Sequence, residues 1–123
     1  MKLIFGNNYA EIKNPRGKYK NKKLVNVHRW CMFLSIDNSK ELTESYISHV
    51  VYHLHPTYKN NRIKVKEHPF ILCRTAYGKF VVGVEVHFQD WLECKPIRLD
   101  YLLNFEEMGT HHSKVVQAFY TDD

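Results

Sequence analysis

Two short segments combine an aromatic ring, a hydroxyl group and turn-forming residues. Residues 54–58 read Leu-His-Pro-Thr-Tyr, and residues 75–80 read Thr-Ala-Tyr-Gly-Lys-Phe. Each adjoins a stretch with strand-like alternation and so falls at a loop tip, and loops on a rigid scaffold are where binding residues concentrate. Aromatic rings at loop tips have no obvious role in a core. The two segments therefore predict an aromatic-lined recognition pocket.

The eight histidines raise a metal hypothesis. His53 and His55 are two residues apart, which would place both imidazoles on one face of a strand, and metal sites use this spacing. Further ligands would have to come from histidines or cysteines distant in the sequence, because no close pair such as C-x-x-C anchors a site. We therefore expect no metal.

Enzyme signatures are missing from the sequence. It contains no G-x-S-x-G elbow, no phosphate-binding P-loop and no G-x-G-x-x-G turn. A triad assembled from distant residues has no support in the sequence either. We expect neither enzymatic activity nor a cofactor.

The formal net charge of +5 is carried by one segment. Residues 11–23 hold six basic residues against one glutamate, and the remainder of the chain is neutral. We interpret residues 13–23 as a basic loop, and such runs are most often simply solvated. A nucleic-acid contact through the loop is the alternative, and its candidate residues are Lys18, Lys20, Lys22 and Lys23.

Three cysteines, Cys31, Cys73 and Cys94, give an odd number without close spacing. The simplest interpretation is buried free thiols in a reducing compartment. The amino terminus lacks a signal-peptide core, and no apolar run is long enough to span a bilayer. These features favour a soluble protein of the cytoplasm or nucleus.

The elements that must hold the two loop tips are strands. Residues 80–88 and 97–103 alternate with period two, and residues 27–34, 46–55 and 70–75 are rich in β-branched or aromatic residues. Residues 113–120 form a weaker candidate strand, and residues 39–48 are expected to form a loop or a single turn. Six to eight short strands without βαβ alternation predict an antiparallel sandwich. At 123 residues the chain has room for a single domain, residues 1–123, with 106–123 as an extension or last strand.

Several separated motifs resemble those of the YEATS domain family, in the family's order. They are residues 4–7 (IFGN), 28–30 (HRW), 50–58 (VVYHLHPTY), 68–70 (HPF), 76–80 (AYGKF), 84–88 (VEVHF) and 97–103 (IRLDYLL). The opening Phe5-Gly6-Asn7 is similar to the branch found in histone-acetyltransferase and histone-exchange complexes. The resemblance implies an immunoglobulin-like β-sandwich of about seven or eight strands, in agreement with the alternation, and a reader of acylated lysine on histone tails.

The resemblance also implies roles for individual residues. Tyr58 and Tyr77 would be the aromatic walls of an acyl-lysine slot, and the Thr57 hydroxyl would bond the acyl amide. The backbone N–H of Tyr77 would donate to the acyl carbonyl.

Four further residues complete the site that the resemblance implies. His55 would support the loop, Phe80 would close the pocket from behind, and Ala76 and Gly78 would flank the Tyr77 turn. Ala76 stands where the family usually has glycine, and a positive φ there would strain the turn by about 1 kcal/mol.

The sequence thus predicts a nuclear, non-enzymatic chromatin reader of acetyl- or crotonyl-lysine. Its expected partners are an acylated histone tail and subunits of a chromatin-modifying or remodelling complex, with a weak DNA contact through the loop. The alternatives are a nucleic-acid binder acting through the basic loop, or a protein-interaction sandwich whose pocket has degenerated.

Overall fold

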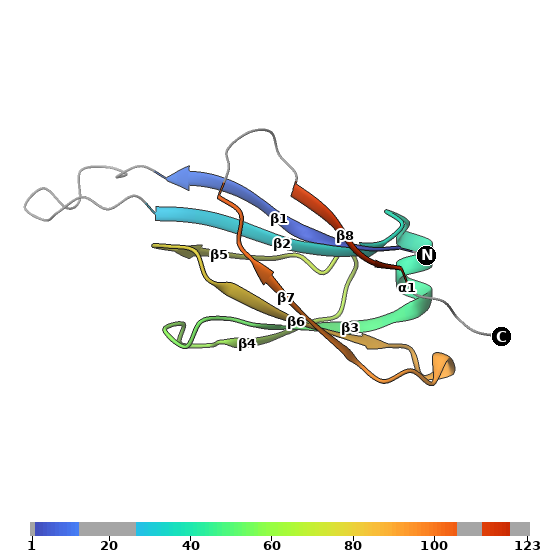
Figure 1. Cartoon of the computed structure of the whole chain (residues 1–123). Coiled ribbons are helices and arrows are strands. Elements are labelled where there is room, and N and C mark those ends of the chain that lie inside the picture. Colours follow the sequence, from blue (N-terminus) through green and yellow to red (C-terminus); the bar gives the residue numbers. More distant parts are fainter. Residues whose placement is uncertain (1, 13–26, 106–111, 119–123) are drawn as a thin grey trace, which may run out of the picture.

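The computed structural model describes residues 2–12, 27–105 and 112–118. Two four-stranded antiparallel sheets face each other (Figure 1). The first has the order β5-β2-β1-β8 and the second β4-β3-β6-β7. The strands are β1 (Lys2–Ile12), β2 (Val27–Ile36), β3 (Ile47–His53), β4 (Arg62–Val65), β5 (Leu72–Ala76), β6 (Val81–Phe88), β7 (Ile97–Leu102) and β8 (His112–Ala118). The predicted antiparallel sandwich is confirmed.

Alternating residues of the facing strands fill the space between the sheets. On β6, Val82, Val84 and Val86 are fully buried, as period-two alternation predicts. The opposing side chains of β2 are equally buried, with Trp30 at 0% exposure. Trp30 is therefore a core residue, and the core lies between the two sheets.

Asn7 links the two sheets through a buried amide. Its Oδ1 accepts the Tyr101 hydroxyl and the Asn104 backbone N–H, each at 2.9 Å, and its Nδ2 donates to the carbonyls of Asn8 and Asn104. Burial of an amide costs little free energy when its donors and acceptor are hydrogen-bonded, as they are here. Asn7 therefore holds β1 against the chain that follows β7.

The expectation of a loop or single turn at residues 39–48 is wrong, because α1 (Lys40–Tyr46) forms there. The Ser39 hydroxyl caps it by accepting the Leu42 N–H at 3.1 Å. The buried Thr43 hydroxyl accepts the Ile36 N–H at 2.8 Å, which joins the helix to β2. No helix in the described part of the chain is long and apolar enough to cross a membrane.

Candidate functional site

Both predicted loop tips lie at the same end of the sandwich, the end opposite α1 (Figure 1). The first joins β3 to β4 and is closed by a bond from the Leu54 N–H to the Asn61 carbonyl at 2.8 Å. Inside it the Tyr58 N–H donates to the His55 carbonyl at 3.0 Å. The second joins β5 to β6. The sandwich topology therefore brings together segments that are about twenty residues apart in sequence.

A cavity of about 450 Å³ opens between the two loop tips. All seven residues predicted for the acyl-lysine site line it, together with two residues of the second loop-tip segment that were given no role: His55, Thr57, Tyr58, Ala76, Tyr77, Gly78 and Phe80, with Thr75 and Lys79. A cavity of this size is within the range of small-ligand sites. The predicted pocket residues thus share one concave surface.

His55 and Thr57 form a local hydrogen-bonded unit at the rim. The Thr57 backbone N–H donates to His55 Nδ1 at 3.2 Å, so this ring nitrogen acts as an acceptor. Thr57 Oγ1 lies 2.9 Å from the same nitrogen and therefore directs its own proton to it. Because the Thr57 hydroxyl acts as a donor in this contact, its oxygen lone pairs are available to accept a hydrogen bond from a ligand.

The Tyr58 hydroxyl joins the two loop tips. It donates to the backbone carbonyl of Thr75 at 2.7 Å, across the cavity from the first loop to the end of β5. Burial raises the pKa of the Tyr58 phenol, and the nearby Trp30 indole and Arg74 offset part of that shift, so the hydroxyl keeps its proton at neutral pH. A backbone carbonyl gives no sequence signal, so the sequence placed Thr75 in the second loop tip without assigning it this role.

Phe80 forms the floor between the cavity and the core. Its ring contacts the edge of Trp30 at a centroid distance of 5.8 Å on the core side. It meets the rings of Tyr58 at 5.6 Å and His55 at 5.9 Å on the cavity side. Phe80 therefore couples the position of both loop aromatics to the rigid core.

The second loop tip presents Tyr77 to solvent. Its side chain is 76% exposed, so it contributes little to the core. The strain considered for Ala76 is absent, because this residue pairs with His28 in β5 and does not belong to the described non-glycine residues with positive φ. The turn therefore accommodates alanine before Tyr77. On the other side of Tyr77, a Cβ built on Gly78 meets no atom within 4 Å.

His53 and His55 do not share a site. His53 ends β3 and its Nε2 lies 3.4 Å from Glu85 Oε2, whereas His55 contacts Thr57 and Phe80. Within the described residues no group of three or more histidine, cysteine or acidic side chains is placed to hold a metal ion. The two histidines are therefore close in sequence but lie in different environments.

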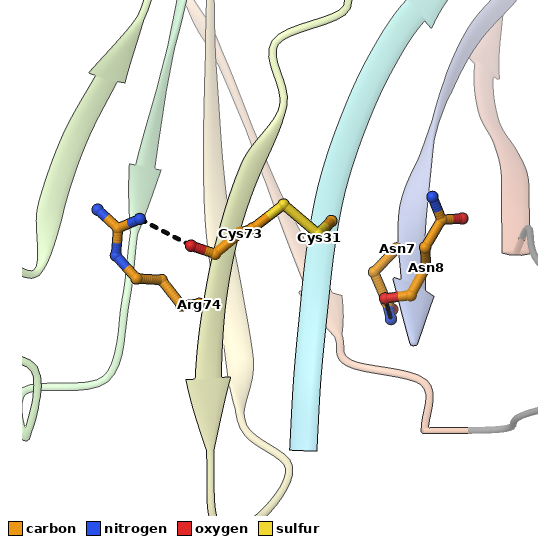
Figure 2. Close-up of a disulfide and its surroundings, with 5 residues drawn as sticks. All are labelled: Asn7, Asn8, Cys31, Cys73 and Arg74. Carbon is orange, nitrogen blue, oxygen red and sulfur yellow. Dashed lines mark hydrogen bonds between the residues drawn. A yellow bond between two sulfur atoms is a disulfide. The ribbon is translucent and has the colours of Figure 1, made fainter. Parts of the chain in front are cut away.

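The prediction of three buried free thiols is wrong. Cys31 and Cys73 form a disulfide, and neither is fully buried (Figure 2). They are directly opposite each other in the β2–β5 pairing, with Cα atoms 4.0 Å apart. Cys94 is free but exposed. Cys31 and Cys73 are 42 residues apart in sequence and are brought together by the register of β2 and β5, which composition alone does not reveal.

A second cavity of about 450 Å³ opens beside this disulfide, on the outer surface of the first sheet. Its lining includes Cys31, Phe33 and Ile71 and contains none of the predicted site residues. It offers mainly apolar surface without a cluster of aromatic rings and hydroxyls, so the loop-end cavity is the better candidate site. The four lysines of the predicted basic loop, Lys18 to Lys23, lie outside the described residues.

Together, the two facing antiparallel sheets define an immunoglobulin-like sandwich with an aromatic-lined cavity at its loop end. Comparison with known families identifies it further. The YEATS family matches residues 25–107, and the chain belongs to that family.

Similar proteins agree with this assignment. The chain is 30% identical over 88 residues to the protein AF-9 homolog of Eremothecium gossypii, covering 72% of this chain and 41% of that protein. It is 28% identical over 86 residues to the Saccharomyces cerevisiae AF-9 homolog, covering 70% and 37%. The chain thus spans less than half the length of these two relatives. Their names are consistent with the branch that the opening motif resembles.

Solved structures show the same fold. The crystal structure of the yeast AF-9 homolog Yaf9 has a TM-score of 0.72 at 23% identity, covering 92% of this chain and 72% of that chain. The Yaf9 YEATS domain bound to H3K27ac has a TM-score of 0.69 at 26% identity, covering 85% and 71%.

Proposed function

We propose that this protein is a non-enzymatic reader of acylated lysine on histone tails, acting in the nucleus as a targeting module of a chromatin complex. The single observation that carries the proposal is the cavity between the two loop tips, which is lined by every residue that the family resemblance assigns to the acyl-lysine slot. The similarity to the Yaf9 YEATS domain, whose structure is bound to H3K27ac, supports the same ligand class.

In the proposed complex the flat acyl amide lies between the rings of Tyr58 and Tyr77. Thr57 Oγ1, whose proton is directed to His55, accepts the amide N–H. The backbone N–H of Tyr77 donates to the acyl carbonyl. Aromatic rings suit a flat neutral group that is satisfied by a few fixed hydrogen bonds. A short or flat acyl chain, acetyl or crotonyl, matches this slot.

Selectivity for the acylated form follows from desolvation. An unmodified lysine must lose the hydration of its ammonium group, and a slot arranged for one amide leaves some ammonium protons without acceptors. Ring faces attract a cation by about 0.5 to 2 kcal/mol. Each buried unpaired polar group costs about 1 to 3 kcal/mol, more when it is charged. The balance gives about a tenfold or larger preference for the acylated lysine.

The test is the Tyr77→Ala variant, titrated calorimetrically with an H3K27ac peptide. Because Tyr77 is 76% exposed, its removal leaves the fold intact while deleting one wall of the slot. We expect at least a tenfold loss of affinity and an unchanged thermal midpoint. Trp91→Ala is the matched control, since Trp91 is a 61% exposed aromatic in the 3-10 helix Asp90–Leu92, remote from the cavity. Wild-type affinity in Tyr77→Ala would contradict the assignment of the pocket.

A further inference from the structure

Five large apolar side chains of the described residues are exposed, and three of them lie at the loop end of the sandwich. Tyr77 lines the cavity there. Val81, the first residue of β6, is 53% exposed, and Leu102, the last residue of β7, is 59% exposed. Because β6 and β7 are antiparallel, both residues lie at the end that carries the loop tips (Figure 1). Single exposed apolar residues are normal, but a group of them beside a cavity indicates a binding surface.

Val81 and Leu102 form one continuous apolar surface, which we call the apolar rim. They are direct cross-strand partners, so their side chains lie on the same side of the sheet with Cβ atoms about 4.5 to 5.5 Å apart. The next pair along the two strands, Val82 and Tyr101, faces the core and is buried. The apolar rim therefore points outward, away from the core.

The remainder of the outward surface of β6 and β7 is polar. Its positions beyond the apolar rim are Gly83, Glu85, His87, Arg98 and Asp100. Exposed apolar side chains on these two strands are thus confined to the strand ends beside the cavity. A solvated sheet surface has no need of valine and leucine there, whereas a ligand that extends out of the cavity would cover them.

The apolar rim is joined directly to the floor of the cavity. Phe80 lines the cavity, and its carbonyl accepts the Leu103 N–H at 3.2 Å. Val81 follows Phe80 and Leu102 precedes Leu103, so each rim residue is the chain neighbour of one partner in this hydrogen bond. The apolar rim and the cavity are therefore parts of one continuous surface.

We propose that the apolar rim binds an apolar side chain of a peptide residue that lies within two positions of the acylated lysine. This inference rests on the proposed function and adds a sequence preference to it. When the acylated side chain lies between the loop tips, the neighbouring Cα atoms of the peptide are 3.8 Å away and the next ones are within about 7 Å. These residues can therefore reach the rim of the same cavity.

A charged flanking residue is the less suitable occupant. The carboxylate next to the apolar rim on β7 is that of Asp100, which is 70% exposed and already lies 3.8 Å from Arg98. The cation at the cavity, Lys79, is also exposed. Ion pairs at exposed positions are weak and are screened by salt. An apolar side chain on the rim, in contrast, removes the apolar surface of both partners from water.

The test is an NMR titration of the whole chain with designed peptides of about twelve residues. Each peptide has glycine and serine around one acetyl-lysine, and leucine, alanine or arginine stands in turn at the two positions before and the two positions after it. We expect about a three- to tenfold preference for leucine over alanine at one or more of these positions, from partial burial of apolar side chains. The preference should be the same at low and high sodium chloride, because apolar contacts are not screened.

The variant Val81→Thr/Leu102→Thr removes apolar surface from the rim and keeps residues that suit a strand. The preference for leucine should fall below about twofold, while the affinity for the alanine-flanked peptide stays within about twofold of the wild type. A misfolded variant would instead lose affinity for every peptide, and Leu102→Thr alone should give an intermediate preference. The matched control is Ile71→Thr, since Ile71 is 54% exposed and lines the second cavity. It should retain the full preference.

The outcomes separate this inference from the reader function. Equal affinity for all acetyl-lysine peptides, a preference for arginine, or a leucine preference that persists in the double variant would each overturn the role of the apolar rim and leave the reader proposal standing. Failure of every acetyl-lysine peptide to bind, H3K27ac included, would overturn both. A wild-type dimer in sedimentation equilibrium that dissociates in the double variant would overturn the inference in favour of a second copy of the chain as the occupant.

Discussion

The hydrogen bond from Tyr58 to the Thr75 carbonyl predicts a measurable effect of removing one oxygen atom. Tyr58→Phe keeps the aromatic wall and its contact with Phe80 but frees the first loop tip from the end of β5. A typical hydrogen bond contributes about 0.5 to 1.5 kcal/mol. Thr75 is exposed and its carbonyl can be rehydrated, so we expect the lower half of this range, about 0.5 to 1 kcal/mol.

This free energy should appear in both stability and binding. The thermal midpoint should fall by about 2 to 5 °C for a chain of this size. The affinity for H3K27ac should fall about two- to fivefold, because the loosened loop must be ordered when the peptide binds. Calorimetric titration and thermal unfolding measure the two quantities.

The control for this prediction is Tyr77→Phe. Tyr77 is 76% exposed, so loss of its hydroxyl should leave the thermal midpoint unchanged. An unchanged midpoint together with unchanged affinity in Tyr58→Phe would refute the argument that this bond pre-organises the cavity.

Other predictions concern stability and the space above the turn. Tyr52 is fully buried and donates to a backbone carbonyl at 2.6 Å, so Tyr52→Phe should cost about 1 to 3 kcal/mol in urea unfolding. Burial raises the pKa of the Tyr52 phenol above its ordinary value of 10.0. Its contribution to the free energy of unfolding is therefore full below pH 10 and declines as the pH rises above 10. In Tyr52→Phe this decrease in stability at alkaline pH should be smaller. The pKa of Glu85 is lowered from 4.5, mainly by its hydrogen bond with His87. Its contribution to the free energy of unfolding is therefore full above about pH 4.5 and is lost as the pH falls through the lowered pKa. In Glu85→Gln the thermal midpoint should depend less on pH in this acidic range. Reducing the Cys31–Cys73 disulfide, which closes a separation of 42 residues, should lower the unfolding free energy by about 4 kcal/mol. Gly78→Ala should leave stability unchanged, because its Cβ meets no atom, yet weaken H3K27ac binding if the peptide occupies that space, as calorimetry would show.

The central strands could be predicted from the sequence because their alternation is regular. Val82, Val84 and Val86 repeat at period two, and all three are fully buried in β6. The weaker candidate at residues 113–120 also forms a strand, β8, which pairs with β1. Regular alternation was therefore sufficient for the central strands of the second sheet, whereas β1 (Lys2–Ile12) lies outside the strands that it predicted.

The short elements could not be predicted in this way. β4 has four residues and half of them are charged, so Ile63 and Val65 alone do not establish a period. α1 has seven residues, too few to show helical periodicity, although Ser39 is a recognisable N-cap. Both elements depend on packing against neighbours that are distant in sequence.

The parts of the candidate site that side chains form could be predicted from the sequence, whereas the parts that depend on backbone groups and strand register could not. The hydroxyls and rings of Thr57, Tyr58 and Tyr77 could be selected by residue type and by the family motifs. The Thr75 carbonyl that holds Tyr58 and the cross-strand position of Cys73 depend on register, which no local pattern of residues reveals.

The most direct test of the reader proposal is one calorimetric titration of the whole chain with an H3K27ac peptide and its unmodified and crotonylated counterparts. We expect binding to the acylated peptides, at least tenfold tighter than to the unmodified one. Equal affinity for all three peptides, or no binding to any of them, would contradict the proposal.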